Sequence, residues 1–350
     1  MPTESAGQRG PRATLADVAA AAGVNASTVS RALATPGRGN PETRERIIRI
    51  AEELNYTPSP SGRALASGRT GAVAVLVSDV TNPFYFGIIR GAQHELRTAG
   101  YSQLLVHTEE DPSIEESTLV RMRGSFDGAI LSAPRLSDAR LAELADEIPL
   151  VVINRPTAGV PSVFIDTPRG FEQSVEHLVS LGHRRICYAA GPTNSWASDI
   201  RWRAVRASGE RLGIETIRIG PFEPRTRFGG AAADAALNTG ATACVAFNDL
   251  LAIGMLSRFA ERGVRVPDDM SIVGCDDIFG ADFCSPPLTT LTAPIERAGR
   301  VAVSMLLEMI SPTAPQVPAR TGVLLATHLT IRSSTGPRTP SESPTPSGAS

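Results

Sequence analysis

The sequence predicts an α/β protein in which a three-helix helix-turn-helix head precedes two doubly wound parallel sheets. A change of pattern along the chain predicts this fold class. Over residues 14–56, apolar residues recur at helical spacing in three short segments. From Gly71, short apolar runs instead alternate with amphipathic segments. At 350 residues the chain is also longer than one ordinary hydrophobic core requires, so we expect a head, a connector and a two-part body.

The charge of the chain is divided unevenly between these parts. The composition is that of a globular protein, with 42% hydrophobic and 20% charged residues and a net charge of −2. Residues 1–70 carry nine arginines and six acidic residues, a net +3, whereas the remainder carries 25 and 30, a net −5. A basic segment joined to an acidic body is typical of a small anion-binding module on a larger carrier.

Several function classes are disfavoured by what the sequence lacks. All 34 basic residues are arginine, which excludes a P-loop lysine, Schiff-base chemistry and a lysine general base. G-x-S-x-G and H-E-x-x-H are absent and the five histidines form no cluster, so we expect neither an α/β hydrolase nor a catalytic or metal site. The four cysteines form no C-x-x-C pair and are expected to be reduced. We therefore predict a protein that is not an enzyme and has no cofactor.

The sequence shows no sign of a membrane partner. Its N-terminus has no apolar core of a signal peptide, and no stretch approaches an uncharged span of ~20 apolar residues. We therefore expect a cytoplasmic protein.

Composition divides the chain into five parts. These are a polar arm expected to be disordered (1–12), the helix-turn-helix domain (13–58), a Pro/Gly/Ser-rich hinge (59–70), the body (71–334) and a Pro/Ser-rich tail expected to be disordered (335–350).

The body contains short apolar runs that we predict to be strands. They are residues 72–77, 102–107, 128–133, 150–154, 162–166, 185–190, 243–248 and 271–275. Residues such as Ile88, Ala92 and Leu96 recur between them at helical spacing. The span is long enough for two sheets with a cleft between them, a usual place for a small ligand.

The first helix of the head has clear start and stop signals. Thr14 and Asp17 have the spacing of a capping box, and Gly23 can adopt the left-handed conformation that ends a helix. The predicted apolar stripe consists of Leu15, Val18, Ala19 and Ala22.

A second helix begins directly after the turn. Asn25 is a good N-cap, and Val29, Ala32 and Leu33 share one face. The outward residues are Ala26, Ser27, Thr28, Ser30 and Arg31. Small or hydrogen-bonding groups of this kind suit a helix that lies in the DNA major groove. The alternative is a small three-helix bundle with a solvated polar face.

The third helix is predicted by Asn40 as N-cap, Pro41 at the first helical position and Glu42 in the first turn. Its apolar side is formed by Ile47, Ile50, Ala51 and Leu54, and its other side carries Arg44, Arg46 and Arg49.

From Thr14 to about Thr335, the chain resembles the LacI/GalR-type bacterial transcriptional repressors. In the head the resemblance rests on TLADVAAAAGVNASTVSRAL, ETRERI and ELNYTP. In the body it rests on NPFY, GYSQLL, FDGAIL, LGHRRI, AGP, FNDLLAIG, RGVRVPDDMSIVGCDD and PPLTTL. The family has a periplasmic-binding-protein-like body that binds an effector and dimerises. The resemblance implies two subdomains, approximately 71–164 plus 293–320, and 165–292 plus 321–334.

The resemblance implies that the second helix binds an operator half-site. Ala26 and Ser27 would take the two main base-reading positions, with Arg31 as a third base contact whose guanidinium suits guanine. The positions implied to hold mainly phosphates are Thr14, Asn25, Thr28 and Ser30. Leu65 matches the hinge leucine that wedges into the minor groove, with an interdomain packing contact as the alternative. Departures from the family pattern occur at Gly39, Ser59, Pro60 and Gly62.

The resemblance also implies an effector cleft. Its implied residues are Phe84, Tyr85, Arg201, Asn248 and Asp276, and Trp196 is expected to add a stacking face. Alternatives remain at two positions, since Asn248 could cap the next helix and Arg201 could be a surface arginine. Ala204 and Cys275 replace a usual glycine and a usual aromatic residue. Arginine, asparagine and aspartate suit a sugar, although related pockets bind purines or phosphorylated signals.

The sequence therefore predicts a transcriptional repressor under allosteric control by a small ligand, most simply a sugar or sugar derivative. We expect a homodimer on a pseudo-palindromic operator, because two-fold symmetric proteins bind two-fold symmetric sites. The alternative is a solute-binding receptor without DNA-binding function.

Overall fold

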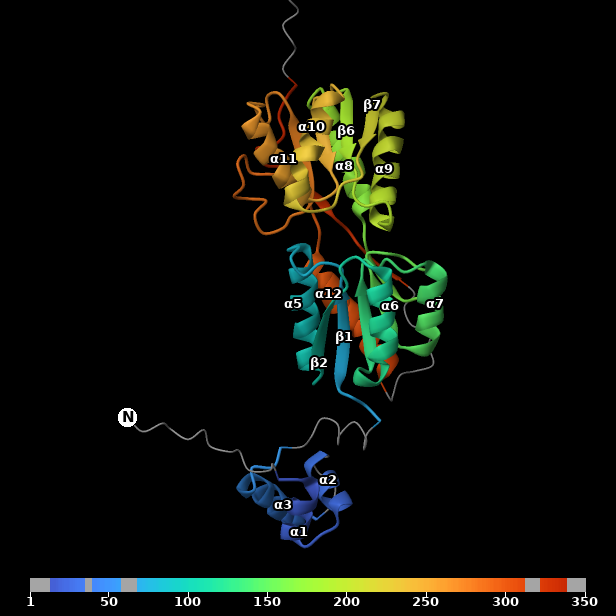
Figure 1. Ribbon diagram of the computed structural model, residues 1–350, viewed down its shortest axis with the longest axis vertical. Coiled ribbons are helices and arrows are strands. Elements are labelled where there is room, and N and C mark those ends of the chain that lie inside the picture. The colour runs from blue at the N-terminus through green and yellow to red at the C-terminus, as the bar shows by residue number, and fades with distance from the viewer. Residues whose placement is uncertain (1–12, 35–39, 58–67, 312–321, 339–350) are drawn as a thin grey trace, which may run out of the picture. The chain divides into compact units, whose positions relative to one another are not determined.

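The computed structural model describes residues 13–34, 40–57, 68–311 and 322–338 (Figure 1). The expected arm and the family departures at Gly39, Ser59, Pro60 and Gly62 lie outside the described residues, and so does Leu65. The chain forms two compact units, Met1–Gly71 and Ala72–Ser350, and each unit is described by itself.

The three predicted helices of the head are confirmed as α1 (Leu15–Ala22), α2 (Ala26–Ala34) and α3 (Pro41–Glu53). The capping box is formed in both directions: Thr14 N donates to Asp17 Oδ2 at 2.7 Å, and Asp17 N donates to Thr14 Oγ1 at 3.3 Å. Gly23 has a φ of +64°, the left-handed conformation that ends α1. Asn40 caps α3 through its side chain, which accepts from Glu42 N at 2.9 Å.

The core of the head follows the predicted apolar faces. Its buried residues are Val18, Ala19, Ala22, Val29, Ala32, Ile47 and Ala51. Four of these seven are alanines, whose small side chains let the three short helices cross closely. Leu54, expected on the apolar face of α3, is instead more than a third exposed, because it is the C-cap residue beyond the last helical turn.

The body begins with a six-stranded parallel sheet in the order β11-β5-β4-β3-β1-β2. Its strands are β1 (Ala72–Val77), β2 (Ser102–His107), β3 (Gly128–Ser132), β4 (Leu150–Ile153), β5 (Ser162–Ile165) and β11 (Gly322–Leu325). One face is covered by α5 (Phe84–Thr98) and α12 (Ile295–Ile310). The other is covered by α6 (Pro112–Arg121) and α7 (Asp138–Glu147), with a 3-10 turn η1 (Arg123–Ser125). We call this layered unit the first lobe.

Two glycines allow α5 and α12 to pack with their backbones in close approach. A Cβ at Gly91 would lie 2.1 Å from the carbonyl oxygen of Glu296, and a Cβ at Gly299 would lie 2.4 Å from that of Ile88. Because real Cβ atoms do not approach so closely, both positions require glycine.

The second lobe repeats this layered architecture (Figure 1). Its sheet has the strand order β12-β10-β9-β8-β6-β7, in which β12 alone pairs antiparallel. Its strands are β6 (Arg185–Ala189), β7 (Glu215–Ile219), β8 (Ala243–Ala246), β9 (Ser271–Asp276), β10 (Thr289–Thr292) and β12 (His328–Thr330). One face is covered by α8 (Thr167–Ser180) and α9 (Trp196–Leu212). The other is covered by α10 (Gly229–Asn238) and α11 (Asp249–Glu261), preceded by a 3-10 turn η2 (Thr226–Phe228). The predicted pair of doubly wound sheets is therefore confirmed.

The chain crosses between the lobes after β5, after β10 and between β11 and β12. The expectation that residues 321–334 belong entirely to the second subdomain is wrong for β11, which pairs in parallel with β5 of the first sheet. The reason is local: Val323 and Leu325 pack on the first-lobe core, and the crossing follows them at 326–327.

The expectation of a disordered tail from residue 335 is also wrong for its first residues. Gly336 O accepts from His183 Nε2 at 3.2 Å and Gly336 N donates to Ser271 Oγ at 3.1 Å. The backbone N–H of Arg338 donates to Leu181 O at 2.9 Å. These hydrogen bonds attach residues 335–338 to the second lobe despite their Pro/Gly composition.

No helix in the described ranges combines the length and the apolar character that crossing a membrane requires.

Candidate functional site

The outward face of α2 is the candidate DNA-binding surface. Asn25, Ala26, Ser27 and Arg31 are exposed, Thr28 and Ser30 are half-buried, and Val29 between them is buried in the head core. Thr14 is exposed at the start of α1. The structure thus brings the head residues implied by the resemblance onto an accessible surface, apart from Leu65, which lies outside the described residues.

Arg31 is the one charged group among these residues of α2, and its side chain lies along its own helix. Its Nε donates to Ser27 O at 3.1 Å, which leaves the terminal guanidinium nitrogens available to a nucleic-acid base. Ala26 offers a methyl group and Ser27 a hydroxyl. Among these three side chains, Arg31 could therefore make the most specific base contact, two parallel hydrogen bonds to a guanine.

The candidate effector site lies between the two lobes of the body, where the parallel strands of both sheets end. First-lobe residues that line it follow the carboxyl ends of β1 to β4: Asn82, Phe84, Tyr85, Glu110, Arg135 and Asn154. Second-lobe residues that line it are Ser195, Arg201, Phe247, Asn248 and Asp276. The carboxyl edge of a doubly wound sheet is the usual place for a ligand, because the connecting loops leave a crevice there.

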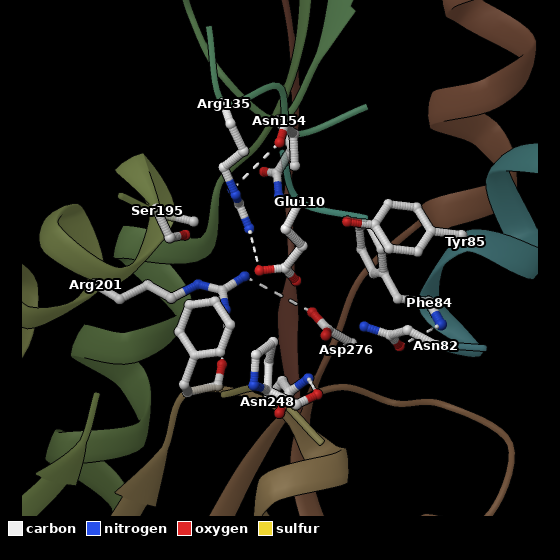
Figure 2. Close-up of a pocket in the computed structure, with 14 residues that line it drawn as sticks. Asn82, Phe84, Tyr85, Glu110, Arg135, Asn154, Ser195, Arg201, Asn248 and Asp276 are labelled. Carbon is white, nitrogen blue, oxygen red and sulfur yellow. Dashed lines mark hydrogen bonds and ion pairs between the residues drawn. The ribbon is translucent and has the colours of Figure 1, made fainter. Parts of the chain in front are cut away.

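Arg201 is fixed in the second-lobe wall from several directions (Figure 2). Its side chain is 3% exposed, and its terminal nitrogens lie 2.6 Å from Phe247 O and 3.7 Å from Asp276 Oδ1. The guanidinium also lies over the rings of Phe171 and Phe247, at 5.4 and 4.7 Å from their centroids. The alternative of a surface arginine is thus not the observed arrangement.

Asp276 ends β9 with a φ of +109°, an uncommon conformation for a residue other than glycine. Burial raises its pKa to about 6, while Arg201 and the thiol of Cys275 oppose that rise. Asp276 is therefore mostly ionised at neutral pH and can accept hydrogen bonds from a ligand.

Asn248 caps the helix that follows it, the alternative that the sequence leaves open. Its Oδ1 accepts from Leu251 N at 3.0 Å and so caps α11, and its Nδ2 donates to Pro224 O at 3.3 Å. The same side chain lines the cleft.

The aromatic first-lobe residues form one edge-to-face pair. The ring centroids of Phe84 and Tyr85 are 5.1 Å apart, and Asn82 Oδ1 accepts from Phe84 N at 3.0 Å at the start of α5. Burial raises the pKa of Tyr85 to about 12, so its hydroxyl remains protonated at neutral pH.

Trp196 differs from the expectation of a stacking face. It is the first residue of α9, and its ring packs edge-on against Phe164 with the centroids 5.5 Å apart. Its neighbour Ser195, the N-cap of α9, lines the cleft instead. Trp196 is therefore not among the residues that line the cleft.

The sequence analysis did not predict three polar residues of the first-lobe wall, Glu110, Arg135 and Asn154. Arg135 and Glu110 form an ion pair at 3.3 Å, and Asn154 lies next to them with a φ of +63° (Figure 2). A signal existed for Asn154, because it directly follows the apolar run of β4. Glu110 and Arg135 lie in loops with no comparable signal.

The lobes are also joined by an ion pair outside the lining. Arg225 of the second lobe lies 3.3 Å from Asp79 of the first, and Asp79 also accepts from Thr81 N at 2.9 Å. In this arrangement the cavity encloses about 40 Å³, space for a few waters. The described ranges contain no group of three or more His, Cys, Asp or Glu side chains arranged to hold a metal ion.

The head and the body each match a known protein family. Residues 14–59 match the bacterial regulatory proteins of the lacI family, and residues 175–335 match a periplasmic binding protein-like domain. The chain is 34% identical over 303 residues to the HTH-type transcriptional regulator DegA of Bacillus subtilis (strain 168), covering 82% of this chain and 88% of DegA.

Two solved structures agree with this match. A Lac repressor dimer bound to operator and the anti-inducer ONPF has a TM-score of 0.81 at 26% identity, over 93% of this chain and 100% of that one. A complex of the transcriptional regulator CelR with cellobiose has a TM-score of 0.67 at 31% identity, over 92% and 100% of the two chains.

Proposed function

The chain belongs to the lacI family of bacterial regulatory proteins, and we propose that it represses transcription as a ligand-controlled homodimer on operator DNA. Its relatives are transcriptional regulators, so the chain is a transcriptional regulator and not an enzyme. Residues 13–58 would bind DNA, 59–70 would form the hinge and 71–334 would bind effector and dimerise, in the cytoplasm where operator DNA is found.

The observation that carries the DNA-binding role is the accessible face of α2 opposite a buried Val29. Arg31 would contact a guanine, with Ala26 and Ser27 beside it on the base edges. The residues proposed to contact phosphates are Thr14, Asn25, Thr28 and Ser30. Leu65 is proposed to wedge into the minor groove at the centre of the site.

Exposed phenylalanines on the body support the homodimer. Phe86 of α5 is 50% exposed, and Phe279 and Phe283 are 80% and 65% exposed with their centroids 5.0 Å apart. Large apolar side chains exposed together usually mark an interface. A dimer formed through this surface would carry two heads, as binding to a pseudo-palindromic operator requires.

The cleft supports control by a small polar ligand, for which we propose a sugar. Arg201, Asn248 and Asp276 offer donors and acceptors next to Phe84 and Tyr85. A ligand that binds one arrangement of the lobes more tightly shifts the population toward it, and the hinge would pass that shift to the heads.

The test is a gel-shift titration of the full chain against genomic fragments at several salt concentrations. We expect sequence-selective binding at submicromolar protein that weakens with salt, because phosphate contacts release counterions. Arg31→Ala should abolish the selectivity, whereas Arg206→Ala, which removes one exposed positive charge from the body, should not. Selective binding unchanged by Arg31→Ala would contradict the role of α2.

The rival function, a solute receptor without DNA binding, makes the opposite prediction. In that case no fragment would be selected at any salt concentration, although a ligand would still raise the melting temperature of the body.

A further inference from the structure

The first-lobe wall of the cleft contains buried polar atoms that lack a partner in the described part of the protein. These are Arg135 Nε and Asn154 Oδ1, one donor and one acceptor. Asn154 is 5% exposed and the Arg135 side chain 6% exposed, and both line the cavity (Figure 2). Buried donors and acceptors are almost always hydrogen-bonded in native proteins, so this pair points to a molecule that supplies one acceptor and one donor.

The charges that line the cavity are already balanced. Arg135 lies 3.3 Å from Glu110, and Arg201 lies 3.7 Å from Asp276. The remaining lining residues are uncharged. An anionic group on a ligand would therefore enter a buried site with no free counter-charge, and burial of an unpaired charge is strongly unfavourable.

We propose that Arg135, Glu110 and Asn154 recognise one end of a small neutral ligand that carries adjacent donor and acceptor groups, such as the vicinal hydroxyls of an unphosphorylated sugar. This inference rests on the proposed effector role of the cleft. Asn154 Oδ1 accepts from one ligand hydroxyl and Arg135 Nε donates to the next. Arg201 and Asp276 bind the other end, so that one ligand contacts both lobes.

Glu110 is the residue that sets the charge preference. Its backbone is held at a φ of +61°, and its N–H donates to Ser78 O at 3.2 Å, so the loop directs the carboxylate to Arg135. A phosphate or carboxylate on the ligand would compete with this carboxylate and would be repelled by it. Removing the charge of Glu110 leaves Arg135 free to pair with an anion.

The cavity of about 40 Å³ requires that the lobes or the lining side chains move to admit a sugar. The ion pair between Arg225 and Asp79 is one contact between the lobes that such a movement would stretch. Binding is therefore expected to be slower than diffusion, without a change in the charge preference.

The test measures binding of matched neutral and anionic sugars to the full chain. The pairs are D-ribose and D-ribose 5-phosphate, D-glucose and D-glucose 6-phosphate, and cellobiose and cellobionate. A thermal-shift screen identifies binders, and calorimetry then gives the affinity ratio for each pair. We expect at least one neutral sugar to bind, with its anionic counterpart weaker by about tenfold or more.

Two variants assign the preference to residues. Glu110→Gln should move the ratio toward the anion by about tenfold, whereas Glu109→Gln, the same change at an exposed neighbour, should leave it unchanged. Asn154→Ala should weaken the neutral sugar by about tenfold, because it removes the acceptor without altering charge. Circular dichroism checks that each variant is folded.

The inference is overturned if no neutral sugar binds, if an anion binds the wild type as tightly as its neutral counterpart, or if Glu109→Gln changes the ratio as Glu110→Gln does. Operator binding is measured in parallel. If the protein binds operator selectively but has the wrong charge preference for sugars, only this inference is overturned. If it does not bind operator selectively, the proposed function is overturned.

Discussion

Each wall of the cleft carries one buried arginine with a carboxylate partner, Arg201 with Asp276 in the second lobe and Arg135 with Glu110 in the first. Arg201 also donates to Phe247 O and lies against two aromatic rings. Arg135 donates to Ala133 O at 3.2 Å, and its Nε has no partner among the described residues.

The two arginines explain how one cleft can be both rigid and selective. A guanidinium held from several sides is in place before a ligand arrives, which lowers the cost of ordering it on binding. A guanidinium with an unsatisfied edge gains a hydrogen bond only when a suitable ligand is present. We therefore assign anchoring to the second lobe and discrimination to the first.

The largest expected effect comes from removing the anchored arginine. Arg201→Met leaves Asp276 and Phe247 O buried without their partner, and breaking a buried ion pair in this way costs about 3–5 kcal/mol. Urea unfolding followed by tryptophan fluorescence measures the change. The control Arg203→Met removes an exposed arginine that pairs with Asp199 on the same helix, and it should cost less than about 1 kcal/mol. Similar losses for both variants would contradict the anchoring role.

The next largest effect tests how the first-lobe arginine is positioned. Glu115 is buried, and its carboxylate accepts from Arg135 N at 2.9 Å and from Leu136 N at 3.1 Å. Glu115→Ala should cost about 1–3 kcal/mol, because it leaves two backbone N–H groups unsatisfied.

Glu115→Ala should also reduce the preference for neutral over anionic sugars, since the backbone of Arg135 loses its hydrogen bond to the Glu115 carboxylate. Glu116→Ala, one residue away and paired with Arg140 near the surface, serves as the control and should change the free energy of unfolding little. Unfolding titrations and the sugar affinity ratio are the two measurements. If a folded Glu115→Ala protein keeps the wild-type ratio of affinities for neutral and anionic sugars, Glu115 does not position Arg135 for ligand discrimination.

The two walls also differ in how much of them the sequence predicts. Arg201, Asn248 and Asp276 match positions of the family's sequence motifs, so the resemblance indicates them, as it indicates Phe84 and Tyr85 in the first lobe. Glu110 and Arg135 come from separate loops that meet only because β2 and β3 flank β1 in the sheet. Strand order is a property of the folded sheet, and no local pattern in the sequence specifies which two loops become neighbours.

The secondary structure is likewise predicted in some parts and missed in others. Strands with continuous apolar runs, such as β1 and β9, are predicted within a residue. The predicted runs miss β7, β10, β11 and β12. β7 and β12 are edge strands of the second sheet and mix polar with apolar residues, whereas the threonines of β10 are buried and Thr290 donates to Asp249 Oδ1. The tail at 335–338 is missed since its attachment depends on His183 and Ser271, which are distant in sequence.

A smaller effect is expected from pH, and it tests the charge state of the anchored pair. The folded-state pKa of Asp276, raised by burial to about 6, lies above the ordinary value of 3.8. The folded state therefore binds the proton more tightly, so this residue adds stability as the pH falls and loses it as the pH rises through about 6. Between pH 7 and pH 5 the gain is about 1 kcal/mol.

Histidines act in the opposite direction over the same range. Burial lowers the pKa values of His177 and His183, so protonation below about pH 6.5 disfavours the folded state. Comparing wild type with Asp276→Asn at both pH values cancels this contribution, because both proteins retain the histidines. A pH dependence that is identical in the two proteins would show that Asp276 does not titrate in this window.

The smallest effect on stability is expected at the ion pair between the walls. Arg225 is partly exposed, so Arg225→Met should lower the free energy of unfolding by less than about 1 kcal/mol. Its larger consequence should be on geometry, because Asp79 then has no second-lobe partner and the lobes separate more readily. Spin labels on exposed sites of α7 and α10 would report a longer or broader distance distribution. Arg227→Met, which removes an arginine paired within the second lobe to Glu223, should leave that distribution unchanged. If both variants keep the wild-type distances, the two walls are held together by the chain crossings and by packing between the lobes, such as Trp196 on Phe164, and ligand selectivity depends on the side chains rather than on lobe separation.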